Sequence, residues 1–276
     1  MNIVAPAKIN LYLDILDKRP DGYHEVLGLM QKISLYDEII VEESDEYSLT
    51  IENNPVLSAE SESNLITRMY KKIKEIRPYI PAFNIILKKN IPIGAGLGGG
   101  SSDAGTFLYY INKEYDLGLS NEEKYNICHD LGADIYFFTI PENTAIVSGI
   151  GDMIEPVTGI KKMEVLLLKP NESLNTGLVY KTLKIGEKPN QDINMLIHGL
   201  KNKDLEMIKN NIYNELEVPA FEIMPKLYGY KKRLIDLGHD ITMMSGSGTT
   251  IFSIKYEKFK DILKNDKYNT FNCRFL

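Results

Sequence analysis

The stretch that decides the fold is Pro92–Gly105, which reads PIGAGLGGGSSDAG. Six of its fourteen residues are glycine, and two serines stand where a helical pattern begins. Because glycine has no Cβ, consecutive backbone N–H groups can turn toward an anion, and the free N–H groups of a helix N-terminus add to this. The stretch therefore predicts a site for a phosphate-bearing ligand.

Two common phosphate loops share part of this pattern. A Walker A loop requires a lysine directly after its second glycine, and with Gly94 and Gly99 as its glycines that position is held by Gly100. The Rossmann pattern is matched by Gly94, Gly96 and Gly99, but a glycine-rich run satisfies it by chance. The helical pattern also starts after Gly100 rather than within the glycines, and the acids Glu114 and Asp116 lie at its end rather than on a second strand. Neither loop fits well.

Apolar residues recur at helical spacing after the loop, and they are Ala104, Phe107, Leu108, Ile111 and Tyr115. We expect Ser101 or Ser102 to cap this helix by accepting from its free N–H groups. A flexible glycine linker, the other alternative, would lack this amphipathic continuation and the Ile91–Ile93 segment in front of the loop. Strand, glycine loop and helix N-terminus are therefore expected to be consecutive.

Composition limits the function classes. The chain has 276 residues, of which 43% are hydrophobic and 25% charged, and its formal net charge of −6 argues against a nucleic-acid partner. No apolar run approaches the ~20 residues needed to span a bilayer, and the start does not resemble a signal peptide. Two cysteines, Cys128 and Cys273, provide neither a disulfide framework nor metal-ligand spacing. We expect a cytoplasmic protein without a membrane partner.

Strand and helix patterns are interspersed along the chain, which predicts an α+β fold in two lobes. A boundary is expected near residues 156–162, which gives domains 1–158 and 159–276. Strands are expected at 3–16, 33–43, 83–88, 135–140, 144–148, 152–155, 165–168, 241–244 and 250–254. Helices are expected after Asn64, Gly100 and Ser120, and at 176–185, 191–200, 203–211 and 220–237.

Two charged residues could act on a phosphate acceptor. Lys8 lies with Asn10 on the polar face of the first strand, where a lysine that is simply solvated is the alternative. Asp134 directly precedes the apolar run 135–140, so it is either a turn residue or a positioned base. A lysine close to Asp134 would keep the carboxylate ionised and could lower the pKa of an alcohol.

The turn Asp21–His24 places an aromatic ring and an imidazole side by side in the sequence. One interpretation is a surface hairpin. The other is a platform for a planar base, on which Tyr23 stacks while His24 hydrogen-bonds the edge of the base.

Taken together, these motifs resemble those of the GHMP kinases. Residues 92–102 resemble the phosphate loop of that superfamily, Ser245–Gly248 its third motif and Ala5–Leu11 its first. More narrowly, Pro6–Leu11, Arg19–His24 and Leu131–Asp134 resemble the family of 4-diphosphocytidyl-2-C-methyl-D-erythritol kinases. The motifs follow the expected order from residue 5 to about residue 252, and Arg19–His24 is the most specific of them.

The resemblance implies a two-lobed fold, with an N-terminal lobe of mixed sheet and helices, a ferredoxin-like C-terminal lobe and an active site between them. It implies transfer of the γ-phosphoryl group of ATP to the 2-hydroxyl of a cytidine-diphosphate-linked methylerythritol, in the non-mevalonate pathway of isoprenoid synthesis. Mg²⁺ is expected with ATP, and its ligands stay open, with Ser102 and Asp134 as candidates. The protein would be a monomer or a homodimer.

The resemblance also implies roles for individual residues. Asp134 would accept the hydroxyl proton as the base, with Lys8 as its partner. Asn10, Tyr23, His24 and Tyr180 would bind the acceptor, the two rings Tyr23 and Tyr180 lying against the cytosine. The residues expected at ATP are Pro92, Ile93, Gly94, Ala95, Gly96, Leu97, Gly98, Gly99, Gly100, Ser101 and Ser102, together with Asn64 and Lys89.

Two other functions remain open at this point. A sibling kinase acting on homoserine or mevalonate would not need the Arg19–His24 turn. A nucleotide-sensing module without turnover should have lost Lys8 or Asp134, and both are present. The loop also departs from the common family pattern at Ala95, Asp103 and Gly105, and none of these changes removes a catalytic group.

Overall fold

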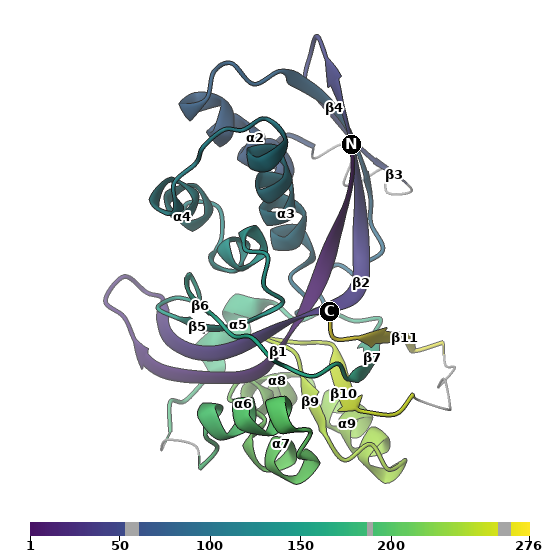
Figure 1. Ribbon diagram of the computed structural model, residues 1–276. Helices are drawn as coiled ribbons and strands as arrows, with labels where there is room; N and C mark the ends of the chain where they lie inside the picture. Colours follow the sequence, from purple (N-terminus) through teal and green to yellow (C-terminus); the bar gives the residue numbers. More distant parts are fainter. Residues whose placement is uncertain (53–60, 187–189, 259–265) are drawn as a thin grey trace. The chain divides into compact units, whose positions relative to one another are not determined.

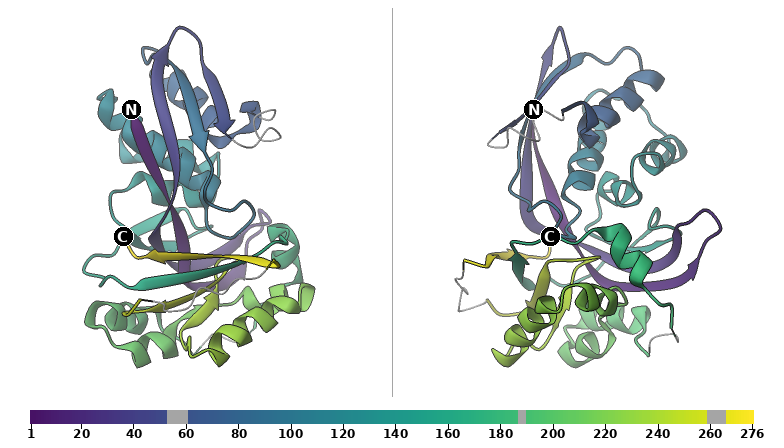
Figure 2. Two further views of the ribbon diagram at one scale, coloured as in Figure 1. Left: turned by 90° about the vertical axis from the view of Figure 1, so that its right-hand side faces the viewer. Right: turned by 180° about the vertical axis from the view of Figure 1, so that it is seen from behind.

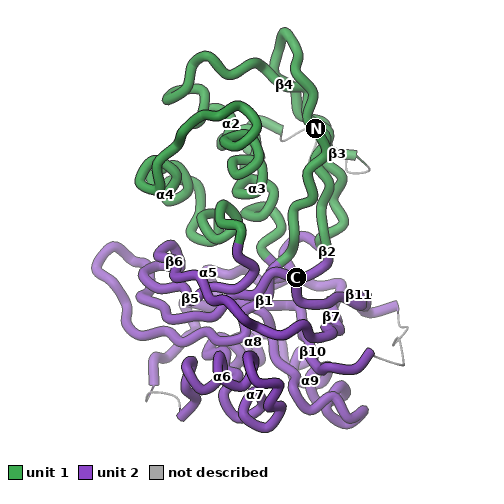
Figure 3. Tube along the Cα trace, in the orientation of Figure 1, with its two compact units in different colours: residues 1–7, 35–91, 98–141 green, residues 8–34, 92–97, 142–276 purple. Residues whose placement is uncertain are grey.

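The computed structural model describes residues 1–52, 61–186, 190–258 and 266–276, and the fold is α+β as predicted (Figures 1 and 2). Two compact units are defined by internal contacts (Figure 3). Unit 1 comprises residues 1–7, 35–91 and 98–141, and unit 2 comprises residues 8–34, 92–97 and 142–276. The long strands β1 (Asn2–Lys18) and β2 (His24–Ser44) contribute residues to both units.

Unit 1 is a small sheet covered by helices. In it β4 (Ala82–Lys88) pairs antiparallel with β2 and parallel with β3 (Ser48–Glu52). Helices α2 (Leu65–Ile76) and α3 (Gly99–Glu114) lie on one face of this sheet (Figures 1 and 2), with α4 (Asn121–His129) and the 3-10 helices η1 (Ser61–Ser63) and η2 (Ala133–Thr139) completing the unit. Buried side chains such as Ile39, Phe83 and Phe107 form one hydrophobic core between the layers.

Unit 2 contains two groups of strands. β5 (Thr144–Ser148) pairs with β2 and with β6 (Met153–Pro156), while β8 (Tyr213–Asn214) pairs parallel with β1. The other four strands form an antiparallel sheet in the order β11 (Tyr268–Arg274), β7 (Glu164–Pro170), β10 (Ile251–Lys255), β9 (Thr242–Met244). Numbered along the chain this is the order 4-1-3-2 of a ferredoxin-like sheet.

Five helices belong to unit 2, among the described residues. They are α5 (Thr176–Thr182), α6 (Ile193–Asn202), α7 (Leu205–Asn211), α8 (Glu217–Ile223) and α9 (Lys226–Asp236). Helices α6, α7 and α9 lie on one face of the four-stranded sheet (Figure 2). A core cluster of this unit joins residues of β1, β7 and helices α5, α8 and α9, with Leu13, Leu166 and Leu227 among its buried members.

Several predicted elements were wrong in detail. The apolar run 135–140 is not a strand but lies in η2, because a short buried run fits either structure. The predicted helix 220–237 is two helices, since Pro225 lacks the N–H that a continuous helix needs. β3, β8 and β11 were not predicted. The contact units also differ from sequential segments, and the domain boundary at residue 158 stays a prediction.

Candidate active site

The first half of the glycine loop, residues 92–97, packs on the Ser245–Thr249 loop within unit 2. Gly94 and Gly96 have positive φ angles of 62° and 73°, where other residues are strained. A Cβ on Gly96 would lie 2.2 Å from the carbonyl oxygen of Ser245, so only glycine allows this approach. The Ser245 hydroxyl donates to the Gly96 carbonyl at 2.9 Å, and the Thr250 N–H donates to the Ala95 carbonyl at 3.3 Å. The structure therefore brings two of the three predicted motifs together.

The third motif, on β1, joins the same loops. Lys8 and Asn10 are buried, with 4% and 2% of their surface exposed, which rules out a simply solvated lysine. The Lys8 ammonium donates to the Asn10 side-chain oxygen at 2.6 Å. The backbone N–H of Lys8 donates to Leu97 O at 2.9 Å. A Cβ on Gly246 would lie 3.6 Å from Lys8 Nζ, which places the Ser245–Thr249 loop directly at this ammonium.

The second half of the loop forms the start of α3 in unit 1. The N-cap is Gly98, with a left-handed φ of 70°, and the helix begins at Gly99. The prediction that Ser101 or Ser102 caps the helix was therefore wrong, because both lie inside it. Ser102 is fully buried and its hydroxyl donates to the Pro6 carbonyl at 2.6 Å. The helix N-terminus leaves its first N–H groups without a side-chain cap, as an anion site requires.

Lys89 lies in a buried ion cluster of unit 1. Its ammonium bonds Asp37, and bonds Asp103 on α3 at 2.7 Å. Asp37 also accepts from the N–H groups of Asn90 and Ile91, at 2.6 and 2.8 Å. Burial raises the pKa of Asp103, and the charge of Asp37 adds to this rise. Burial opposes the charge on Lys89, but the two carboxylates outweigh it and raise the pKa of the ammonium.

This cluster fixes the chain that leads into the glycine loop. The Lys89 charge is balanced here by two carboxylates, and its expected role at ATP stays a prediction. Sequence reasoning missed Asp37. Its signal was the neighbouring acids Asp37 and Glu38 inside the apolar strand pattern of 33–43. The two side chains of neighbouring strand residues point to opposite faces, so one of these acids is buried and requires a partner. Asn64, also expected near ATP, is the N-cap of α2 and its side-chain oxygen accepts from Ile66 N–H at 2.9 Å.

Asp134 lies in the first turn of η2, which packs closely on α3 in unit 1. The close packing depends on Gly105, because a Cβ there would lie 2.5 Å from the Ile135 carbonyl oxygen and 2.7 Å from Phe138 Cβ. The Ile135 N–H donates to Gly132 O at 3.1 Å and closes the turn that carries the aspartate. Gly105, noted as a departure from the family pattern, thus has a packing reason: it brings α3 against the segment that holds Asp134.

The turn before β2 is built by its own sequence. Gly22 N–H donates to Arg19 O at 3.1 Å, and Gly22 has a φ of 89°, while Pro20 supplies the φ that the second position of a turn favours. Arg19 pairs with Asp21 and with Glu25, both at 3.0 Å. These contacts hold Tyr23 at the surface with 60% of it exposed. An exposed aromatic ring is what a stacking platform needs.

His24 and Tyr180 lie together, although they are 156 positions apart in the sequence. Their ring centroids are 5.0 Å apart with planes inclined by 34°, and both side chains are half-buried. Burial, with the nearby charge of Lys18, lowers the pKa of His24, so the ring is neutral at pH 7. A neutral imidazole has one donor and one acceptor, which suits the edge of a planar base.

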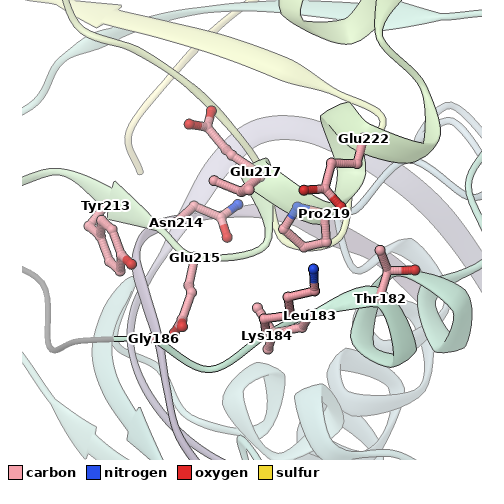
Figure 4. Close-up of a pocket in the computed structure, with 11 residues that line it drawn as sticks. Thr182, Leu183, Lys184, Gly186, Tyr213, Asn214, Glu215, Glu217, Pro219 and Glu222 are labelled. Carbon is pink, nitrogen blue, oxygen red and sulfur yellow. The ribbon is translucent and has the colours of Figure 1, made fainter.

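A pocket of about 330 Å³ lies elsewhere in unit 2, between the end of α5, β8 and the start of α8 (Figure 4). Its lining includes three acids, Glu215, Glu217 and Glu222, and one lysine, Lys184, and none of the predicted site residues lines it. Within the described residues, no three His, Cys, Asp or Glu side chains come together as a metal site. Of the helices described, none is both long and apolar enough to cross a membrane.

Comparisons with known proteins agree with these motifs. The model of the GHMP kinases N terminal domain matches residues 64–141. The 4-diphosphocytidyl-2-C-methyl-D-erythritol kinase of Listeria monocytogenes serotype 4b is 36% identical over 264 residues, which covers 95% of this chain and 90% of that protein. The enzyme of the same name from Thermodesulfovibrio yellowstonii is 38% identical over 261 residues, covering 91% and 88%.

Solved structures show the same relationship. A crystal structure of a 4-(cytidine 5'-diphospho)-2C-methyl-D-erythritol kinase superposes with a TM-score of 0.79 at 30% identity, covering 92% of this chain and 90% of that one. The homoserine kinase of Cytophaga hutchinsonii gives a TM-score of 0.71 at 19% identity, covering 93% and 85%. At that identity the second likeness concerns the fold alone.

Proposed function

The chain belongs to the family of 4-diphosphocytidyl-2-C-methyl-D-erythritol kinases, and from this premise we propose that its own acceptor is the 2-hydroxyl of 4-diphosphocytidyl-2-C-methyl-D-erythritol. The family makes it an ATP-dependent phosphotransferase with an alcohol acceptor, in the non-mevalonate route to isoprenoids. The observation that carries the choice of acceptor is the pair of His24 and Tyr180 rings beside the Arg19–Tyr23 turn. A kinase for homoserine or mevalonate has no use for a base platform.

Phosphoryl transfer requires an activated hydroxyl and a stabilised γ-phosphoryl group. Asp134 accepts the proton of the acceptor hydroxyl, whose oxygen then bonds the γ-phosphorus. The bond from that phosphorus to the bridging oxygen breaks and ADP leaves. Lys8 stabilises the negative charge that gathers on these oxygens, and its bond to Asn10 fixes the direction of its ammonium. The backbone N–H groups of the glycine loop hold the phosphates of ATP.

Mg²⁺ is the expected companion of ATP. It usually keeps several waters and binds substrate phosphates with only one or two protein groups, so it needs no cage of protein ligands. Ser102 suits such a role, because its hydroxyl hydrogen goes to Pro6 and lone pairs remain on the oxygen. Asp134 is the second candidate ligand. When bound, the ion would neutralise phosphate charge.

The acceptor prediction is tested by a kinase assay with three acceptors side by side. The purified protein with ATP and Mg²⁺ is given the diphosphocytidyl compound, homoserine or mevalonate, and ADP release is followed by a coupled reaction. We expect turnover with the first compound only. Turnover with either of the others would identify a sibling kinase, and ATP binding without turnover on any acceptor would identify a sensor.

We place the enzyme in the cytoplasm, as a monomer or a homodimer. Cys128 and Cys273 are both buried and both free thiols, which is in keeping with a reducing compartment. Sedimentation of the purified protein at several concentrations distinguishes the two oligomeric states.

A further inference from the structure

A buried asparagine hydrogen-bonds the backbone at the start of the Ser245–Thr249 loop. Asn214, on β8, is 4% exposed and donates both of its amide hydrogens to backbone carbonyls. One hydrogen goes to Met244 O and the other to Gly246 O, each at 2.8 Å. The side-chain oxygen accepts from Leu216 N–H at 3.0 Å. The asparagine thus grips the chain immediately before and immediately after Ser245.

Only a carboxamide can make this set of contacts. It offers two donors on one nitrogen and an acceptor on the other arm, and all three are used here. Aspartate has the same shape but no donors, so its carboxylate would face two carbonyl oxygens in a buried place. Serine is too short to reach both carbonyls.

Glu217 binds Met244, the residue directly before this loop. One carboxylate oxygen accepts from Met244 N–H at 2.8 Å, and the other pairs with Lys231 at 2.6 Å. Asn214, at the end of β8, and Glu217, the first residue of α8, lie three positions apart in the sequence, so one short segment binds both the N–H and the carbonyl of Met244. We call these two residues the loop clamp.

The residues that the loop clamp holds, Ser245 and Gly246, contact the glycine loop and β1. Ser245, between the two gripped carbonyls, donates to Gly96 O at 2.9 Å and accepts from Asn10 N–H at 3.4 Å. Gly246, gripped directly, lies beside Lys8 and Asn10: a Cβ on it would be 3.3 Å from Asn10 Oδ1. A shift of the Ser245–Thr249 loop would therefore move the carbonyl of Gly96 and the surroundings of the Lys8 ammonium together.

We propose that Asn214, assisted by Glu217, is a positioning residue for ATP, because it presses the Ser245–Thr249 loop against Gly96 and so sets the shape of the phosphate loop. This rests on the proposed role of residues 92–102 at the ATP phosphates. Asn214 itself does not touch the reacting atoms. Its effect reaches the nucleotide through Ser245 and Gly96.

The test compares Asn214→Asp with a matched control, Asn211→Asp. Asn211 also uses both ends of its amide on backbone groups, donating to Met207 O at 2.8 Å and accepting from Asp192 N–H at 3.0 Å, but these lie at α6 and α7. Calorimetry with a non-hydrolysable ATP analogue and Mg²⁺ gives the dissociation constant. We expect Asn214→Asp to raise it about 10-fold or more and Asn211→Asp to change it less than about twofold.

A double substitution separates positioning from general loss of stability. Ser245→Ala removes the hydroxyl that the loop clamp directs and leaves Asn214 intact. If the two residues act through one contact, the double variant binds the analogue no more weakly than the weaker single variant. The proposal is overturned if the fold-changes in dissociation constant of the two single variants multiply in the double variant. It is also overturned if Asn214→Asp is folded by circular dichroism and binds the analogue as the wild type does.

If Asn214→Asp does not fold, Ser245→Ala alone decides, since unchanged affinity in that variant also overturns the proposal. The readout is nucleotide binding and not turnover. A wild-type protein that binds ATP but fails with the diphosphocytidyl acceptor would therefore refute the proposed function while the loop clamp could still be measured.

Discussion

At the scale of single residues, Asp134 has the sharpest prediction. Asp134→Asn keeps the shape of the side chain and removes the base, so we expect kcat to fall about 10²- to 10⁴-fold with little change in the thermal unfolding temperature. Asp130→Asn is the control. Asp130 is an exposed carboxylate just before the same segment, and it pairs with Lys72 at 2.9 Å. Its kcat should stay within about twofold of the wild type. A fully active Asp134→Asn enzyme would rule out the base.

His24 predicts a pH dependence of acceptor binding. Its pKa is lowered, first by burial and then by the charge of Lys18, so the ring takes up a proton only below its ordinary value of about 6.5. The KM for the acceptor should therefore change with a midpoint below pH 6.5 and be constant well above it. His24→Asn should lack the acid change. A transition in KM centred above pH 6.5 in the wild type, absent from the variant, would contradict a lowered pKa.

Residue identities at the site were predictable where a motif carried them, and their contacts were not. Alternation along β1 put Lys8 and Asn10 on one face, and both do lie together. No spacing rule could pair His24 with Tyr180, because their contact depends on how β2 and α5 fold back on each other. Asp37 was overlooked since its partners, Lys89 and Asp103, come from separate elements.

At the scale of elements, the packing of α3 on η2 depends on Gly105. In Gly105→Ala the new methyl group must displace the Ile135 carbonyl, which we expect to cost about 1–3 kcal/mol of unfolding free energy despite the better helix propensity of alanine. Because η2 carries Asp134, kcat should fall as well. The measurements are urea unfolding and steady-state kinetics.

Gly229→Ala is the control for helix propensity. Gly229 lies inside α9 and a Cβ on it meets nothing within 4 Å, so this substitution should stabilise the protein by about 0.5–1 kcal/mol. A Gly105→Ala protein that is stabilised to the same degree would show that α3 and η2 are not in close contact.

The ion cluster joins β2 and α3 through Lys89, which directly follows β4, and removing this cation should cause a large loss of stability. Lys89→Met leaves the carboxylates of Asp37 and Asp103 buried without an ammonium, and we expect about 3–5 kcal/mol of destabilisation in urea unfolding. Lys88→Met, one position away, loses only an exposed pair with Glu52 at 3.9 Å and should cost under about 1 kcal/mol. Equal losses in the two variants would contradict the importance of the cluster.

Element types followed from periodicity where a segment was long. The amphipathic pattern after the glycines predicted α3, and the alternation of β1 predicted its strand. The run at 135–140 was taken for a strand because burial on all sides hides the period that separates helix from strand. The start of α3 was placed too late, since a glycine in the left-handed region caps the helix where a serine was expected.

At the scale of the whole molecule, nucleotide binding should stabilise the fold by mass action. A non-hydrolysable ATP analogue with Mg²⁺ at about 100 times its dissociation constant should add about 2.7 kcal/mol to the unfolding free energy. Thermal unfolding with and without the analogue measures this. If Mg²⁺ binds with the phosphates, EDTA should remove most of the shift and have no effect on the protein alone. A shift that survives EDTA would contradict a metal-assisted phosphate site.

The two predicted lobes are each one continuous stretch of the chain, but each compact unit consists of several separate stretches. A composition break near residue 156 suggested one cut, whereas unit 1 is made of three stretches that alternate with stretches of unit 2. Strand pairs explain the difference, because β8 near residue 213 pairs with β1 near residue 12. Contacts between residues so far apart leave no local signal in composition.

This alternation sets an order of events during synthesis on the ribosome. All stretches of unit 1 have been made when residue 141 emerges, whereas residues 8–34 and 92–97 of unit 2 must wait for partners that come much later. Ser245, which bonds Gly96, is translated 149 residues after it. A growing chain therefore carries Lys8 and the glycines long before the Ser245–Thr249 loop that packs on them has been made.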